Sequence, residues 1–410
     1  MIKRNNSESI FNCTRNTLTI KIKSVFDYFI VGWIIYTSGI VTIAYNDFIF
    51  LIFGTTFFIL LILYDSITIQ YKSLDFILFV ILEAVTCIQL AISGIDGHIF
   101  NGSLKMILMF LFCYISSRRL TIQTFARVFS NIILVIASIS IVMYWFNTEI
   151  LASGSFPILR TSDITSYANL FVYCVSTAVP HRNCGVFWEP GAFQVFLNLA
   201  LLFTLNYRDF SRRGLRIAII MIAILTTVST TGYICSSLIL IAFLVSTDLR
   251  NRVKAILFLT AIFISVSSIV LPIAMDSFSY KFGFESGIVS SNVTSRLNPF
   301  ILDLYLIKDY FLGLPGIDYY AELLTCYGIA HQLSYHSSSC TPTMTMVVYG
   351  IIPGFLLVYG IVKFGRGFFS PKIRVLVIVS VLTMFLTESF LTFALYYFLA
   401  FMGHARRKKS

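Results

Sequence analysis

An arginine and a carboxylate lie close together in the sequence at the start of a predicted membrane helix. The stretch from Arg182 to Phe193 reads RNCGVFWEPGAF, and Glu189 directly precedes Pro190. Proline suits the first helical turn, because its φ is already helical and its missing N–H would have no partner there. A guanidinium can hold two phosphate oxygens at once, and a carboxylate can accept a proton. The stretch therefore predicts a phosphate-handling site or, more simply, a helix start with an Arg182–Glu189 pair.

Further residues suited to phosphate chemistry fall in two long segments that we predict to lie outside the membrane. These segments contain Arg160, Arg182 and Arg296. A single arginine is equally well explained by lipid headgroups or a local ion pair, but together the three could hold a lipid-linked phosphate. His336 lies shortly before a helix expected to start near Thr343, and it could face a site at that helix end.

Several chemistries are disfavoured by the absence of their motifs. The chain contains no Cys-x-x-Cys, no His-Glu-x-x-His, no Asp-x-Asp and no glycine-rich phosphate loop. We therefore expect neither a metal nor a cofactor, and nucleotide substrates are disfavoured. The net charge of +11 does not indicate nucleic-acid binding, because the basic residues fall in short clusters between apolar runs. That pattern is typical of cytoplasmic loops.

The elements that must position these residues are membrane helices. The chain has 410 residues, of which 57% are hydrophobic and 12% charged, as in a polytopic membrane protein. We expect an all-α integral membrane protein in which 1–410 forms a single membrane domain. About twelve transmembrane helices are predicted from the apolar runs: 26–44, 48–64, 75–92, 104–117, 126–146, 190–206, 215–230, 232–247, 254–274, 343–362, 373–386 and 389–403.

Positive charge predicts how these helices are oriented. With a cytoplasmic N-terminus, 24 of the 30 basic residues fall on the inner side, as the positive-inside rule expects. Both termini are then cytoplasmic, and the long segments 147–189 and 275–342 face outward. The outer side keeps six basic residues: Lys105, Arg160, Arg182, Lys281, Arg296 and Lys308.

The second outer segment contains two further signals. Asn298 and Pro299 open an amphipathic pattern that predicts a surface helix, and a Gly-Leu-Pro-Gly turn at 313–316 ends it. Cys326 and Cys340 lie in the same segment and could form a disulfide or remain two free thiols.

Two polar features remain open to two interpretations each. Glu83 lies in the middle of the third predicted span, where a carboxylate is either functional or a protonated packing group. The Ser-Thr-Thr-Gly turn at 229–232 joins two spans on the outer side, and a tight polar hairpin is its simplest interpretation.

The pattern Arg182-x-x-Gly-x-Phe-Trp-Glu-Pro-Gly-Ala-Phe193 resembles the signature of O-antigen and capsule repeat-unit polymerases of the Wzy type. Three further features are similar in order to the O-antigen polymerase and ligase superfamily. They are the turn at 229–232, Arg296 followed by the surface helix and the 313–316 turn, and His336 before a span with two glycines. The Arg-x10-Gly pattern of some members is absent.

This resemblance implies a lipid-donor, GT-C-like glycosyltransferase in the bacterial cytoplasmic membrane. Such enzymes transfer a glycan from undecaprenyl pyrophosphate to another lipid-linked repeat unit, without metal or nucleotide. Arg182, Arg296 and Arg160 would bind the pyrophosphate, and His336 or Glu189 would act as the catalytic base. Membrane lipids, and in addition a flippase and a chain-length regulator, are the expected partners.

Two other functions are compatible with the sequence. An O-antigen ligase uses the same donor with a lipid A core acceptor, although the Glu-Pro-Gly stretch favours a polymerase. A polysaccharide flippase or secondary transporter would also have about twelve spans, but transporters often show two similar halves. Here the halves are unlike each other, and the long loops are external.

Overall fold

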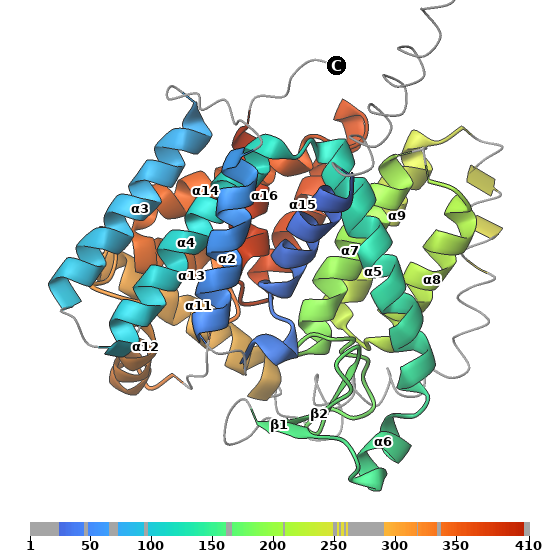
Figure 1. Cartoon of the computed structure of the whole chain (residues 1–410), viewed down its shortest axis with the longest axis horizontal. Coiled ribbons are helices and arrows are strands. Elements are labelled where there is room, and N and C mark those ends of the chain that lie inside the picture. Colours follow the sequence, from blue (N-terminus) through green and yellow to red (C-terminus); the bar gives the residue numbers. More distant parts are fainter. Residues whose placement is uncertain are drawn as a thin grey trace, which may run out of the picture.

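The computed structural model describes residues 24–44, 48–64, 73–93, 97–160, 166–207, 210–248, 252–253, 256–257, 260, 291–317, 319–333 and 338–405. The described chain is mostly helical, and Figure 1 shows its helices packed side by side. Ser24–Tyr36 forms the first helix. The later helices are η1 (Val41–Ala44), α2 (Phe48–Tyr64), α3 (Leu74–Ser93), α4 (Gly97–Arg119), α5 (Ile122–Tyr144), α6 (Asn147–Ser153), α7 (Pro190–Asn206), α8 (Arg213–Thr226), α9 (Thr230–Ser246), α11 (Ser291–Asp309), α12 (Tyr319–Ala330), α13 (Thr341–Tyr349), α14 (Ile351–Gly365), η2 (Pro371–Ile373), α15 (Arg374–Leu386) and α16 (Ala394–His404).

The helices have the composition of a membrane protein. Three stretches are long and apolar enough to cross a membrane: Leu74–Ile92, Phe100–Arg119 and Ile122–Tyr144. The shorter apolar helices include the first helix, α7, α9, α14 and α15. The chain is therefore a membrane protein by the length and composition of its helices. The predicted count of twelve spans stays a prediction, and most of the run at 254–274 lies outside the described residues.

Helix α7 is buried within the helical bundle. Every residue from Pro190 to Leu205 is buried, which is what a helix that is apolar on all sides requires. Aromatic rings join it to its neighbours: Phe196 stacks on Phe187 at 4.1 Å between ring centroids, and Phe129 of α5 lies parallel to Phe196. The start of α7, which carries the Glu-Pro-Gly stretch, is thus held on a rigid element.

The predicted single helix over 343–362 is wrong, because the chain breaks at Gly350 between α13 and α14. Gly350 has a φ of +95°, a conformation that favours glycine. The break is closed by Gln89 of α3, whose Nε2 donates to the carbonyl oxygens of Leu314 at 2.9 Å and Val348 at 2.7 Å. Backbone groups released from a helix inside a membrane protein need such internal partners.

The first outer segment is not all-α. It folds into α6 and a three-stranded antiparallel sheet of β1 (Ile158–Arg160), β2 (Ser166–Asn169) and β3 (Cys174–Ser176). Figure 1 shows α6, β1 and β2 together at one end of the molecule, with α12 of the second outer segment at the same end. The elements of the two long segments that the structure describes and Figure 1 labels here, α6, β1, β2 and α12, therefore lie at one end of the bundle.

The surface helix of the second outer segment begins earlier than predicted. Helix α11 starts at Ser291 and contains Pro299 in its interior, so Asn298 and Pro299 do not open it. The predicted turn at 313–316 does follow its end, and Gly313 has a φ of +106°. The last predicted span also starts later, because α16 begins at Ala394 and not at 389.

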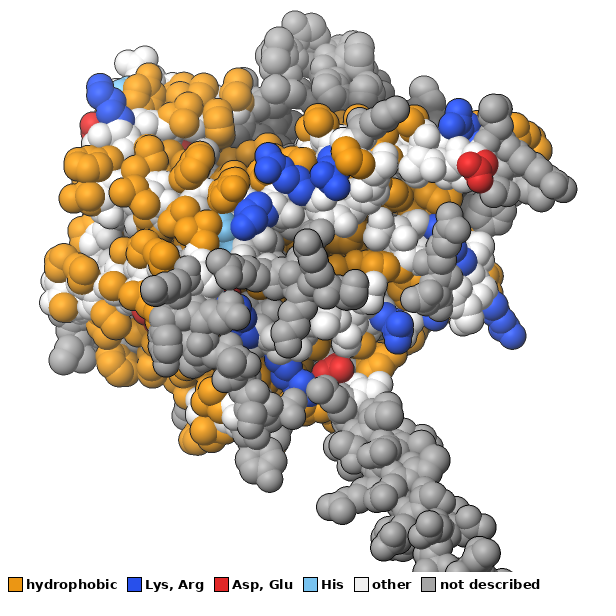
Figure 2. Space-filling model, turned by 90° about the horizontal axis from the view of Figure 1, so that it is seen from above, with side chains coloured by type: hydrophobic (Ala, Val, Ile, Leu, Met, Phe, Trp, Pro, Cys, Tyr) orange, Lys and Arg blue, Asp and Glu red, His pale blue; other side chains and the backbone are white. Residues whose placement is uncertain are grey.

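Basic side chains gather on the end of the molecule opposite the sheet. Figure 2 looks onto that end and shows many more Lys and Arg than Asp and Glu side chains. This distribution has the form that the positive-inside rule gives to a cytoplasmic face. The orientation of the chain in a membrane stays a prediction, with both termini inside.

Candidate functional site

The candidate site lies where the first outer segment enters α7. A hydrogen bond joins the sheet to the Arg182–Glu189 stretch: the hydroxyl of Tyr167 in β2 donates to the carbonyl oxygen of Trp188. Next to it, Asn183 is fully buried, and its amide donates to Ser140 of α5 at 3.1 Å and to Thr226 of α8 at 2.9 Å. Residues near both ends of the Arg182–Glu189 stretch are therefore fixed by hydrogen bonds.

Arg182 is half-buried and directed toward the end of α8. Its Nε donates to the carbonyl oxygen of Thr227 at 3.0 Å. A cation is favoured at a helix C-terminus, where unpaired carbonyls carry negative partial charge. Two features singled out in the sequence, Arg182 and the turn at 229–232, are thus brought together.

The turn at 229–232 is also the start of α9, and it packs against α7. Ser229 is the N-cap, and its hydroxyl accepts from the backbone N–H of Gly232 at 3.3 Å. A Cβ on Gly232 would lie only 3.0 Å from the Cβ of Gln194, and Asn198 donates to the Gly232 carbonyl at 3.2 Å. The turn is a capped helix start that places α9 directly beside the Glu-Pro-Gly end of α7.

Glu189 occupies the N-cap position of α7 in an extended conformation, with φ −155°. Its Oε1 accepts a hydrogen bond from the indole N–H of Trp188 at 3.0 Å. Among the described residues, Arg118 pairs with Asp75 at 2.6 Å and Arg119 pairs with Asp27 at 3.3 Å. Neither ion pair includes Glu189. Within that part of the chain, the predicted Arg182–Glu189 pair is not found.

Glu388 was not identified as a site residue from the sequence, yet its carboxylate lies directly at the start of α7. The side chain is buried, with 2% of its surface exposed. A Cβ on Gly191 would fall 2.0 Å from Glu388 Oε1, so only glycine fits there. The positive end of a helix dipole favours a carboxylate at this position. The sequence does show an acidic residue between two apolar runs, but it does not show which helix that residue contacts.

The same loop is tied to the start of α13. The hydroxyl of Thr341 donates to the carbonyl oxygen of Glu388 and accepts from the backbone N–H of Phe390 at 2.7 Å. Thr341 is the first residue of α13, and it is fully buried. The starts of α7 and α13 therefore meet at the loop that follows α15.

A second buried carboxylate connects the described elements of the second outer segment to α13. Asp303 of α11 is fully buried and accepts hydrogen bonds from the hydroxyls of Tyr320 at 2.5 Å, Ser338 at 2.9 Å and Thr343 at 2.6 Å. Burial raises the pKa of Asp303 to about 6, and these hydrogen bonds hold the pKa below the value that burial alone would give. Asp303 thereby joins α11, α12, the segment before α13, and α13 itself.

The structure says less about the surroundings of the other predicted site residues, Arg160, Arg296 and His336. Arg160 ends the edge strand β1, where its side chain is exposed. Arg296 lies in α11, about two helical turns before Asp303. His336 lies outside the described residues. The structure thus brings Arg182 to the end of α8, just before α9 begins, and it does not place His336.

The other features left open in the sequence have mixed outcomes. Cys326 is exposed, Cys340 is buried and both are free thiols, so a disulfide between them is wrong. Glu83 is half-buried in α3, and its Oε1 has no hydrogen-bond partner among the described residues. Within those residues no three His, Cys, Asp or Glu side chains are grouped as metal ligands. Metal-independent chemistry stays a prediction.

Comparison with known proteins gives no assignment. No family model matches the chain, and no curated protein matches it. The resemblance of the Arg182–Phe193 stretch to repeat-unit polymerases therefore rests on the residues themselves.

Proposed function

We propose that this protein is a repeat-unit polymerase of the bacterial cytoplasmic membrane. It would transfer an oligosaccharide from undecaprenyl pyrophosphate to another lipid-linked repeat unit, on the outer face, to build O-antigen or capsular polysaccharide. One observation carries the proposal: Arg182 of the polymerase-like stretch is fixed by its Nε to Thr227, the C-cap of α8, just before α9 begins. A planar guanidinium can hold two phosphate oxygens at once.

The transfer requires two kinds of group. A hydroxyl oxygen of the acceptor sugar forms a bond to the anomeric carbon of the donor. The bond from that carbon to the pyrophosphate oxygen breaks, and the pyrophosphate leaves with the electron pair. Arg182 and Arg296, with Arg160 as a third candidate, would stabilise the charge on the leaving group. Glu189 or His336 would take the proton of the hydroxyl.

Glu388 changes how the donor would be held. The N-terminus of a helix can bind a phosphate, but the start of α7 already has a carboxylate against Gly191. A pyrophosphate at the same point would meet like charge. In this proposal the arginines therefore supply the binding, and Glu388 is a positioning residue that fixes the loop after α15 against α7.

Deletion of the gene, followed by gel analysis of surface polysaccharide, tests the proposal. A polymerase predicts loss of the ladder, with a single repeat unit still attached to the core. Loss of all polysaccharide beyond the core would instead indicate a ligase or a flippase. An unchanged ladder would contradict all three functions. A flippase and a chain-length regulator are expected to act beside the enzyme in the same membrane.

A further inference from the structure

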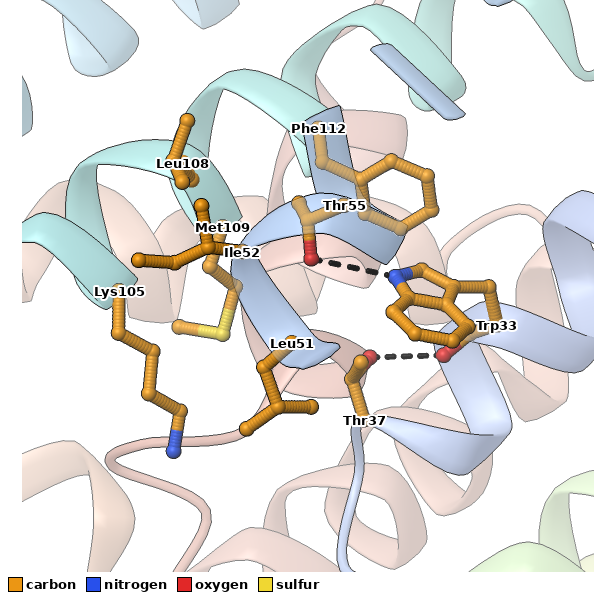
Figure 3. A pocket seen from close by; sticks show the side chains of 9 residues that line it. All are labelled: Trp33, Thr37, Leu51, Ile52, Thr55, Lys105, Leu108, Met109 and Phe112. Carbon is orange, nitrogen blue, oxygen red and sulfur yellow. Dashed lines mark hydrogen bonds between the residues drawn. The ribbon is translucent and has the colours of Figure 1, made fainter. Parts of the chain in front are cut away.

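A cavity between the first helix, α2 and α4 is too small to bind a lipid or a sugar. Its volume of about 20 Å³ has room for about one water molecule. Figure 3 shows Trp33 in its wall, where the indole N–H donates to Thr55 at 3.3 Å and the carbonyl oxygen accepts from Thr37 at 2.8 Å. A surface suited to a larger partner lies instead at the sheet end of the molecule.

The turn between β2 and β3 presents two large apolar side chains at the surface. Phe171 is 76% exposed, and Val172 is 54% exposed. Phe171 also has a φ of +64°, a left-handed conformation that is unusual for a bulky side chain. Strained backbone of this kind is concentrated where a side chain has a task. An exposed phenylalanine held in this conformation therefore points to a partner outside the described chain.

The backbone of this turn is paired within the turn itself. The N–H of Leu170 donates to the carbonyl oxygen of Tyr173 at 2.9 Å, and the N–H of Val172 donates to the carbonyl oxygen of Leu170 at 2.8 Å. The N–H of Phe171 donates to Oδ1 of Asn169 at 2.8 Å. A backbone donor that leaves water without a partner is costly. These three donors would keep their partners in an apolar environment.

The hairpin around the turn carries no charge. No residue from 164 to 180 is Asp, Glu, Lys, Arg or His, and this range includes β2, the turn and β3. A charged group is the most expensive group to bring into lipid. A protein partner would usually meet a polar rim around the apolar contact. The lack of charge therefore favours lipid as the partner.

The turn is held beside the end of a candidate membrane span. Helix α5 is long and apolar enough to cross a membrane, and the exposed Trp145 and Phe146 directly follow it. Such aromatic residues are typical of the boundary between membrane and water. Tyr173, at the end of the turn, is buried and donates its hydroxyl to Oδ1 of Asn147 at 2.9 Å. Met143 of α5 packs against the buried cluster that includes Tyr173.

We propose that the turn between β2 and β3 inserts into the membrane surface. Phe171 and Val172 would lie at the boundary between headgroups and acyl chains, beside Trp145 and Phe146. Burial of the two side chains removes apolar surface from water, and the paired backbone and the lack of charge keep the cost of insertion low. This proposal depends neither on the proposed enzymatic activity nor on the orientation of the chain.

Insertion of the turn has a consequence for the candidate site. Tyr167, on the strand that leads into the turn, is bonded to the carbonyl oxygen of Trp188. A turn anchored in the membrane surface would therefore hold the Arg182–Glu189 stretch close to that surface.

Photo-crosslinking of the purified full chain in vesicles of phosphatidylethanolamine and phosphatidylglycerol tests the proposal. The photoreactive residue p-benzoylphenylalanine replaces Phe171, and mass spectrometry identifies what it is linked to. The same replacement at Ser155, which is exposed in the loop before β1, is the control for a position in water. The replacement at Val135, which is 59% exposed in the middle of α5, is the control for a position in lipid. Position 171 should give several-fold more lipid adduct than position 155.

A second probe position separates insertion from the tolerance of position 171 to replacement. Val172→p-benzoylphenylalanine places the probe at the neighbouring exposed residue, and it should also give lipid adducts. Lipid adducts at position 135 but at neither 171 nor 172 would overturn the proposal. Equal yields of adduct at 155 and 171 would overturn it too, as would crosslinks from 171 mainly to another segment of this chain or to a second copy.

Discussion

Replacing Asp303 by Asn should change how the stability of the protein depends on pH. The carboxyl group has a pKa of about 6 in the folded chain, against an ordinary value of 3.8. Asp303 is fully buried, and its helix lies outside the three candidate membrane spans. A group whose pKa is raised on folding binds its proton more tightly in the folded state, so stability falls as pH rises between the two values.

The size of the effect follows from the difference between these pKa values. One pH unit corresponds to about 1.4 kcal/mol, so wild type should lose about 2 to 3 kcal/mol from this group between pH 4 and pH 7. Asp303→Asn cannot titrate there. Three hydroxyl groups donate to the two carboxyl oxygens of Asp303, and in the variant an amide N–H₂, which cannot accept, replaces one of these oxygens. The variant should therefore be less stable than wild type at pH 4.

The assay is unfolding by sodium dodecyl sulfate in mixed micelles at pH 4 and pH 7. The free energy of unfolding of wild type relative to Asp303→Asn should fall by about 2 to 3 kcal/mol across this range. Asp309→Asn is the matched control, because Asp309 lies on the same helix, is exposed and accepts a hydrogen bond from Tyr327. A constant difference between wild type and Asp303→Asn, or one that rises with pH, would refute the reasoning.

The remaining predictions concern the start of α7, the thiols and the topology. Gly191→Ala should lower the free energy of unfolding by about 1 to 3 kcal/mol, because the added Cβ collides with Glu388. The same unfolding assay measures this change. Gly214→Ala is the control and should have a much smaller effect, since its Cβ would meet nothing within 4 Å. In unreduced, denatured protein, Cys326 and Cys340 should both be alkylated in full, and mass spectrometry that finds them linked would contradict the structure. In intact cells a membrane-impermeant maleimide should label the exposed Cys326 but not a cysteine added to the C-terminal tail, and labelling of that tail would reverse the predicted topology.

Much of the helical framework could be predicted from the sequence. A helix pairs its own backbone groups, so a long apolar run in a membrane protein specifies a helix without help from distant residues. The runs at 48–64 and 190–206 coincide with α2 and α7. The sheet after α6 was missed because three strands of three or four residues give little periodicity to detect.

The missed features depend on contacts between residues far apart in the chain. At the break at Gly350, the carbonyl of Val348 accepts from Gln89, more than 250 positions away, and from the backbone N–H of Leu314. The position of Glu388, in the loop after α15, likewise depends on its contacts with the distant residues Gly191 of α7 and Thr341 of α13. In the candidate site, the sequence identified Arg182 and the turn at 229–232 separately. It could not show that the arginine is bonded to Thr227, just before that turn.

The central claim is that arginines at the outer face hold the pyrophosphate of a lipid-linked donor. Its most direct test is polymer formation by membranes that contain Arg182→Ala or Arg296→Ala at wild-type protein level. If the arginines hold the pyrophosphate, each alanine variant should abolish polymer. Arg182→Lys should restore it only in part, because lysine keeps the charge but loses the planar fork of the guanidinium. Normal polymer formation by well-expressed Arg182→Ala and Arg296→Ala would contradict the account.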